Sequence, residues 1–111
     1  MREITIDGKE TRLRATPLAL LYYKQEFDRD LIGDLIKMQG LEHDPEVFDS
    51  VIFLQLIWAL AKADKPKDFP SFPAWVSKLD SIDFSDQKLL IAVMEEAVDG
   101  FFRGQEKKGK H

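Results

Sequence analysis

Hydrophobic and polar residues alternate in two short segments at the start of the chain. Residues 3–6 and 11–15 each follow a period of two, which predicts β-strands. The segment Asp7-Gly8-Lys9-Glu10 lies between them, and Asp-Gly is a frequent turn sequence. We expect a β-hairpin over about residues 2–15, with a four-residue loop that sets Ile4 opposite Leu13, because this register keeps one apolar face together. A two-residue turn at Asp7-Gly8 would instead set Ile6 opposite Lys9.

After the hairpin, the spacing of hydrophobic residues becomes helical. Thr16 is a favourable N-cap and Pro17 suits the first helical position, so we expect a helix that runs to Phe27. This helix is apolar nearly all round, which predicts that it is either central or covered by a partner. Asp28-Arg29-Asp30 breaks it and offers a new N-cap for a second short helix, ended by Gly40.

A third helix is predicted to form the core. Asp44-Pro45 repeats the cap-and-proline pattern, a long apolar run that includes Trp58 follows, and Lys65-Pro66 ends the helix. Residues 64–73 form a proline-rich loop, and Pro73 is expected to start a short helix. We expect Trp58 to be buried.

The last helix is the most clearly amphipathic segment of the chain. Ser85 is its expected N-cap, and apolar residues recur at helical spacing as far as the pair Phe101-Phe102. Glu95 and Glu96 are assigned to its solvated face. Gly104 is placed to end it.

These elements predict a mainly α fold of the α+β type. We expect a single helical domain over residues 1–104, with about five helices and the N-terminal hairpin. Residues 105–111 are polar and basic, and we expect a disordered tail there.

Composition favours binding over catalysis. The 111 residues include no Cys and two His, but 8 Phe, 2 Trp and 2 Tyr. The lack of Cys excludes disulfides and thiol catalysis, and a net charge of -4 argues against nucleic-acid binding. The longest apolar run, residues 51–61, is too short to span a membrane. The N-terminus has no apolar signal region, so we expect a cytoplasmic protein.

No set of residues predicts a catalytic, cofactor or metal site. His43 has no second His or Cys to form a ligand set, and it is read as a loop residue beside a capping Asp. Asp28, Asp30 and Asp34 have helical spacing, but Arg29 lies among them, so capping and solvation explain them better than a cation does. We therefore expect no enzyme activity, no cofactor and no metal.

Several short motifs, in order, resemble small tail assembly chaperones of long-tailed phages and prophages. In that family a strand pair leads into a helix that ends in a Tyr-x-x-x-Phe-Gly-x-Asp-like run, and residues 14–31 resemble this part. This chain has Asp28 at the position where the family pattern favours Gly. Residues 58–61, Trp-Ala-Leu-Ala, match a Trp-Ala-hydrophobic-Ala segment, and residues 72–76 match a Phe-x-x-Trp-hydrophobic segment. The resemblance covers residues 1–103, and none of its motifs is catalytic.

The resemblance implies a partner. Such chaperones bind the long, hydrophobic, helical tape measure protein before the tail tube polymerises around it, in the cytoplasm of the bacterial host. Other tail proteins and self-association are further expected contacts, and neither nucleic acid nor membrane is expected. The hypothesis for the partner-binding groove comprises five aromatic residues: Phe69, Phe72, Trp75, Phe101 and Phe102.

Two questions stay open at the level of sequence. The family often makes a longer form by ribosomal frameshifting, and Glu106-Lys107-Lys108 could be encoded by a slippery heptamer. The alternative functions are another phage structural or connector protein, or a helical protein-protein adaptor; an enzyme is a weaker alternative.

Overall fold

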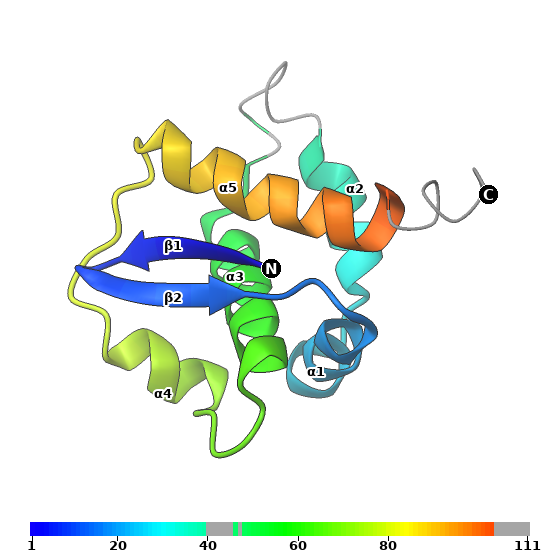
Figure 1. Ribbon diagram of the computed structural model, residues 1–111, viewed down its shortest axis with the longest axis horizontal. Coiled ribbons are helices and arrows are strands. Elements are labelled where there is room, and N and C mark those ends of the chain that lie inside the picture. The colour runs from blue at the N-terminus through cyan, green and yellow to red at the C-terminus, as the bar shows by residue number, and fades with distance from the viewer. Residues whose placement is uncertain (40–45, 47, 104–111) are drawn as a thin grey trace.

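The computed structural model describes residues 1–39, 46 and 48–103, and it confirms the predicted fold class of helices with an N-terminal antiparallel hairpin (Figure 1). The predicted tail 105–111 lies outside these residues, as do Gly40, His43, Asp44-Pro45 and Gly104. The elements in chain order are β1 (Arg2–Ile6), β2 (Lys9–Leu13), α1 (Pro17–Phe27), α2 (Leu31–Met38), α3 (Ser50–Asp64), α4 (Phe72–Ser77), α5 (Gln87–Val98) and the π-helix η3 (Asp99–Arg103).

The hairpin turns at two residues rather than four. Asp7-Gly8 has positive φ at both positions, 53° and 77°, the pattern of a tight turn whose twist matches paired strands. Ile6 therefore lies opposite Lys9, and the predicted pairing of Ile4 with Leu13 is wrong. The two registers differ by two residues and leave the same side chains on each face. The requirement for one apolar face therefore cannot distinguish the two registers, whereas the backbone geometry of the Asp7-Gly8 turn does.

Polar contacts hold the hairpin to the rest of the molecule at its start, its turn and its end. Its apolar face is buried, with β1 packed on α5 and β2 packed on α3. The contacts are Arg2 Nη1 with Glu95 Oε1 (2.7 Å), the Asp80 N–H donated to Asp7 Oδ2 (2.9 Å), and Arg14 Nη2 with Asp64 Oδ1 (3.2 Å).

The break between α1 and α2 forms as predicted. Asp28 adopts the left-handed conformation, with φ of 53°, and its N–H donates to the Lys24 carbonyl, so an Asp fills the place where a Gly is favoured. Asp30 then caps α2, since its Oδ1 accepts the Ile32 N–H. Thr16 occupies the N-cap position of α1 but makes no capping bond.

The caps of the two later helices are Asp49 and Asp86 rather than the predicted Asp44 and Ser85. α3 begins at Ser50, because Asp49 Oδ1 accepts the N–H groups of residues 51 and 52. At α5, Asp86 Oδ1 accepts the N–H groups of residues 88 and 89. The predicted cap Ser85 bonds instead to Asp83, and the hydrogen bonds from Ser85 hold the pKa of that carboxyl below its ordinary value. Each helix thus starts directly after the aspartate whose carboxylate accepts two N–H groups that have no partner within the helix.

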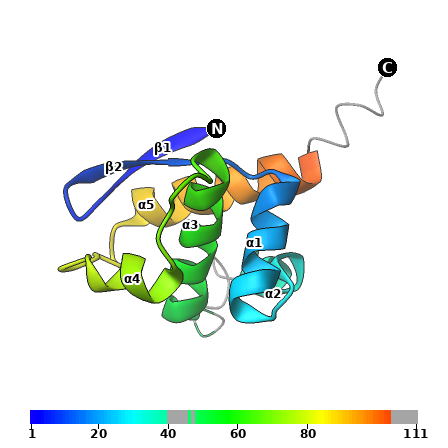
Figure 2. The same ribbon diagram turned by 90° about the horizontal axis from the view of Figure 1, so that it is seen from below.

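The core lies around α3. Trp58 is fully buried as predicted, together with Phe53 and with Tyr23 of α1. Figures 1 and 2 show α1 beside α3, the hairpin across one end of α3, and α4 against its flank. α4 has no buried residue of its own.

Candidate functional site

α1 presents apolar side chains on its outer face. Ala19 and Tyr23 are buried against the core, but Leu18 and Leu21, one turn apart, are 42% and 49% exposed. Tyr22 is half-buried, with the Lys62 ammonium 4.5 Å from its ring centroid. The sequence allowed a central helix or one covered by a partner, and the structure does not place α1 at the centre.

Phe101 and Phe102 lie close to the start of this helix. They belong to η3, whose Gly100 packs so tightly on Ala15 that a Cβ added there would lie 2.5 Å from the Ala15 carbonyl oxygen. Both phenylalanines are half-buried against the core. Figures 1 and 2 agree in placing η3 beside the beginning of α1.

The other three predicted partner-binding residues surround Trp58. The ring centroids of Phe69 and Phe72 each lie 6.4 Å from that of Trp58, and Trp75 stacks on Phe72 at 6.3 Å. All three are half-buried. Two hydrogen bonds fix this cluster: Trp58 Nε1 donates to the Pro70 carbonyl at 3.0 Å, and the Phe72 N–H donates to Glu26 Oε2 at 2.9 Å.

The five residues do not form one groove. The cluster at α4 and the pair in η3 lie at opposite ends of the molecule in both views (Figures 1 and 2). Sequence spacing cannot reveal this separation, because it depends on tertiary packing, with α4 against α3 and α5 against β1.

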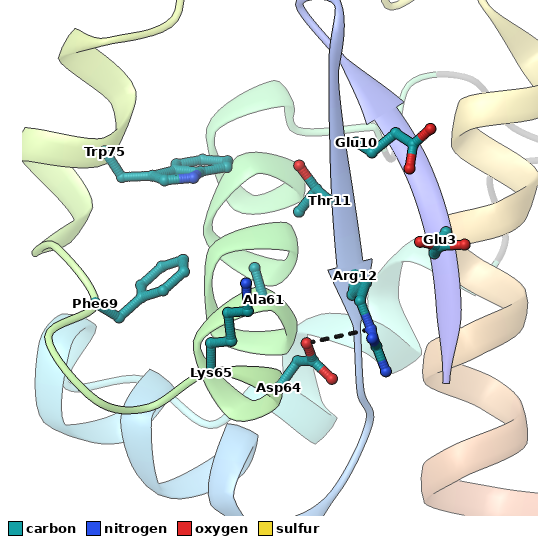
Figure 3. Close-up of a pocket in the computed structure, with 9 residues that line it drawn as sticks. All are labelled: Glu3, Glu10, Thr11, Arg12, Ala61, Asp64, Lys65, Phe69 and Trp75. Atoms are coloured by element: carbon teal, nitrogen blue, oxygen red, sulfur yellow. Dashed lines mark ion pairs between the residues drawn. The ribbon is translucent and has the colours of Figure 1, made fainter.

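A cavity of about 350 Å³ lies between β2, α3 and α4 (Figure 3). Phe69 and Trp75 point into it from one side, and polar residues of the hairpin and α3 line the other. Asp64, nearly buried at the end of α3, has Arg12 at 3.5 Å and Arg14 at 3.2 Å. Two of the five predicted residues therefore border this cavity.

Sequence reasoning assigned Asp34 to solvent, and the structure contradicts this. The side chain is buried, and its two oxygens accept bonds from Arg29 at 2.6 and 2.8 Å and from the Tyr23 hydroxyl at 2.7 Å. The hydrogen bonds from Arg29 lower the pKa of Asp34, and the hydrogen bond from Tyr23 lowers it further. The pKa of Tyr23 is raised, mainly because its hydroxyl is buried and also because it bonds to the Asp34 carboxylate. This is a structural network that joins α1, α2 and the connection between them.

Glu96 was also placed on the solvated face, which is wrong. It is buried, and its Oε2 accepts the Ala15 N–H at 3.0 Å. Both acids were detectable, because each occupies a position in the apolar stripe of its helix, beside Leu31 and Leu35 in α2 and beside Val93 and Ala97 in α5. A charged residue in phase with a buried stripe predicts a buried, bonded charge.

Across the residues that the structure describes, no group of three or more His, Cys, Asp or Glu side chains could hold a metal ion. Within the same residues, no helix has the length and apolar character needed to cross a bilayer. Comparison of this chain with protein-family models, with curated protein sequences and with solved structures finds no match.

Proposed function

We propose that this chain is a phage or prophage tail assembly chaperone that binds the hydrophobic, helical tape measure protein in the bacterial cytoplasm during tail morphogenesis. The observation that carries the proposal is the outer face of α1. Leu18 and Leu21 are exposed on a helix that is otherwise packed on α2 and α3. An outward apolar pair at i and i+3 suits the apolar stripe of a partner helix.

The pair in η3 extends this surface. Phe101 and Phe102 lie beside the start of α1 and are only half-buried, so a partner helix along α1 would also reach η3. Burying a leucine fully contributes about 1.5–3 kcal/mol, and a few such contacts give moderate affinity. Moderate affinity suits a chaperone that must release its partner when the tail tube assembles.

The proposal is tested by co-expression with fragments of a tape measure protein taken from the same genome. The wild-type chain is expected to co-purify with at least one fragment and to keep it soluble. The Leu18→Gln/Leu21→Gln double variant is expected to weaken binding about ten-fold or more, since each half-exposed leucine contributes about 0.7 kcal/mol or more, half the value for full burial, and the two together about 1.4 kcal/mol, a factor of ten. Phe102→Ala is expected to weaken it as well.

Ile91→Gln provides the matched control. Ile91 is 50% exposed on α5, so this variant removes similar apolar surface elsewhere. It is expected to bind as the wild type does, with circular dichroism showing that every variant is folded. Failure of the wild-type chain to bind any fragment would contradict the proposal. The same genome offers a second check, because a tail tube gene upstream and a very long tape measure gene downstream are expected.

A further inference from the structure

We propose that the cavity between β2 and α4 binds an extended peptide segment that carries an arginine or lysine, by adding it as a third strand to the hairpin. The inference concerns a second surface, separate from the outer face of α1, and does not require a tape measure protein as partner. Three observations carry it: the free edge of β2, the shape of the cavity, and the side chains that line it.

Among the described parts of the chain, no strand pairs with the second edge of β2. In an antiparallel ladder, residues alternate between those bonded to the paired strand and those that point outward. Lys9 follows the two-residue turn and is paired with Ile6, so Glu10 and Arg12 direct their N–H and C=O groups to the outer edge. Between the residues that the structure describes, no backbone hydrogen bond uses these four groups.

The outer edge of β2 faces α3 and the cavity. The next outward group along the chain, the Arg14 N–H, donates to the Leu60 carbonyl of α3 at 3.0 Å. Three consecutive residues, 10 to 12, line the cavity. Because successive side chains point to opposite faces of a strand, a cavity bordered by all three runs along its edge. The backbone groups of Glu10 and Arg12 are therefore placed to pair with a strand there.

The unpaired backbone groups favour a strand over a helix. An added strand would lie about 4.7–4.9 Å from β2, between it and the rings of Phe69 and Trp75, which project toward the hairpin (Figure 3). An α-helix has its N–H and C=O groups bonded within itself, so only an extended segment can pair with the outward groups of Glu10 and Arg12.

The lining favours a basic side chain. It has three carboxylates, from Glu3, Glu10 and Asp64, against the two cations of Arg12 and Lys65. Asp64 already has Arg12 at 3.5 Å, so the two glutamates remain for an incoming charge. In Figure 3 the Glu3 and Glu10 carboxylates lie on the other side of β2 from the Phe69 and Trp75 rings, so a long basic side chain is needed. The apolar stem of arginine or lysine can pack on the rings while its charged head reaches over β2 toward Glu10. The net charge of -4 also attracts a basic segment.

The test is a titration of the ¹⁵N-labelled full chain with a synthetic probe. The probe is an acetylated and amidated hexapeptide of alternating valine and threonine with one central arginine. Amide signals of Glu10 and Arg12 and the indole signal of Trp75 are expected to shift, and the two amides to exchange more slowly with deuterium. Substitution of the arginine by glutamate, or N-methylation of alternate amides, is expected to weaken binding about ten-fold.

Two variants locate the binding mode. Glu10→Pro removes an outward N–H and a lining carboxylate but no bond to β1, and it is expected to weaken probe binding about five-fold. Trp75→Leu is expected to weaken it about ten-fold, whereas Tyr22→Leu, which alters an aromatic residue of α1, is expected to leave it unchanged. Folding of each variant is confirmed by its unperturbed core signals.

Several outcomes would overturn the inference. The first is that millimolar probe shifts neither the Glu10 nor the Arg12 amide signal. The second is that the N-methylated peptide or the glutamate peptide binds as tightly as the probe. The third is that an alanine-rich helical peptide with the same arginine binds at these amides more tightly than the probe does. Shifts of the same amides on concentrating the chain alone would assign the edge to a second copy and would also overturn it. Binding of tape measure fragments to α1 is measured separately, so either proposal can fail without the other.

Discussion

At the scale of single residues, the network around Asp34 decides how α1, α2 and α3 meet. The Tyr23 hydroxyl of α1 donates to Asp34 of α2 at 2.7 Å and lies 3.2 Å from Gln55 Oε1 of α3. Arg29, in the connection between α1 and α2, completes the network with two bonds. A buried carboxylate is tolerated here because its oxygens are bonded and its charge is paired.

Tyr23→Phe is expected to lower the free energy of unfolding by about 1–2 kcal/mol, because it removes the hydroxyl but keeps the ring. Urea unfolding at pH 7 measures the change. Tyr22→Phe, which alters a half-buried tyrosine on the same helix, serves as control and is expected to change stability by less than about 0.5 kcal/mol. Equal losses in the two variants would show that the network contributes no more than an ordinary surface residue.

Stability is expected to depend on pH through both partners. The pKa of Asp34 is lowered from 3.8, so its contribution is present above pH 3.8 and is lost as pH falls through the lower folded-state pKa. The pKa of Tyr23 is raised from 10.0, so its contribution is present below pH 10.0 and is lost as pH rises above it. Urea unfolding from pH 2 to 11 measures both changes. Asp34→Asn should flatten the acid side and Tyr23→Phe the alkaline side; unchanged slopes would contradict this.

At the scale of elements, sequence predicted which segments fold and missed how some of them begin. The hairpin, the break at Asp28 and the helices were predictable, since each has a strong local signal in hydrophobic period or turn residues. The register was missed because two registers share one apolar face. The starts of α3 and α5 were missed because Asp49 and Asp86 compete with nearby caps, and the geometry of the preceding chain decides which carboxylate reaches the helix.

Gly100→Ala is expected to destabilise the protein by about 1–3 kcal/mol. An added Cβ would overlap the Cβ of Ala15 and lie 2.5 Å from its carbonyl oxygen, so η3 would have to move away from the start of α1. Thermal unfolding measures the loss. Gly33→Ala in α2 is the control, since its Cβ would meet only the Asp30 side chain at ordinary distances. It should be neutral or stabilise by about 0.5–1 kcal/mol, and similar losses in both variants would contradict tight packing at Gly100.

At the scale of the whole molecule, burial is uneven. α3 contributes eight buried residues and α4 none. α4 is held by half-buried rings, by the bond from the Phe72 N–H to Glu26, and by the Ser71 cap. The aromatic character of the region around α4 was visible in the sequence. The cavity beside it was not, because it depends on where β2 crosses α3, which no local pattern encodes.

Native-state hydrogen exchange is expected to reflect this unevenness. Amides in the middle of α3, such as those of Ile57 and Leu60, should exchange only through global unfolding, because their side chains are fully buried. The Trp75 amide of α4 and the amide of Lys78, the C-cap residue of α4, should exchange through a local opening at least about 100-fold faster. Mass spectrometry or NMR measures the rates. Equal protection of α3 and α4 would mean that α4 opens only together with the core.

The three attachments of the hairpin have a consequence for recognition at its edge. A two-stranded ribbon alone is marginally stable in water, but here its beginning, turn and end are each tethered to a different part of the helical body. The strand that would receive a peptide is therefore ordered before any encounter. Only the incoming segment has to lose conformational freedom, so even a short one can dock with a modest entropic penalty.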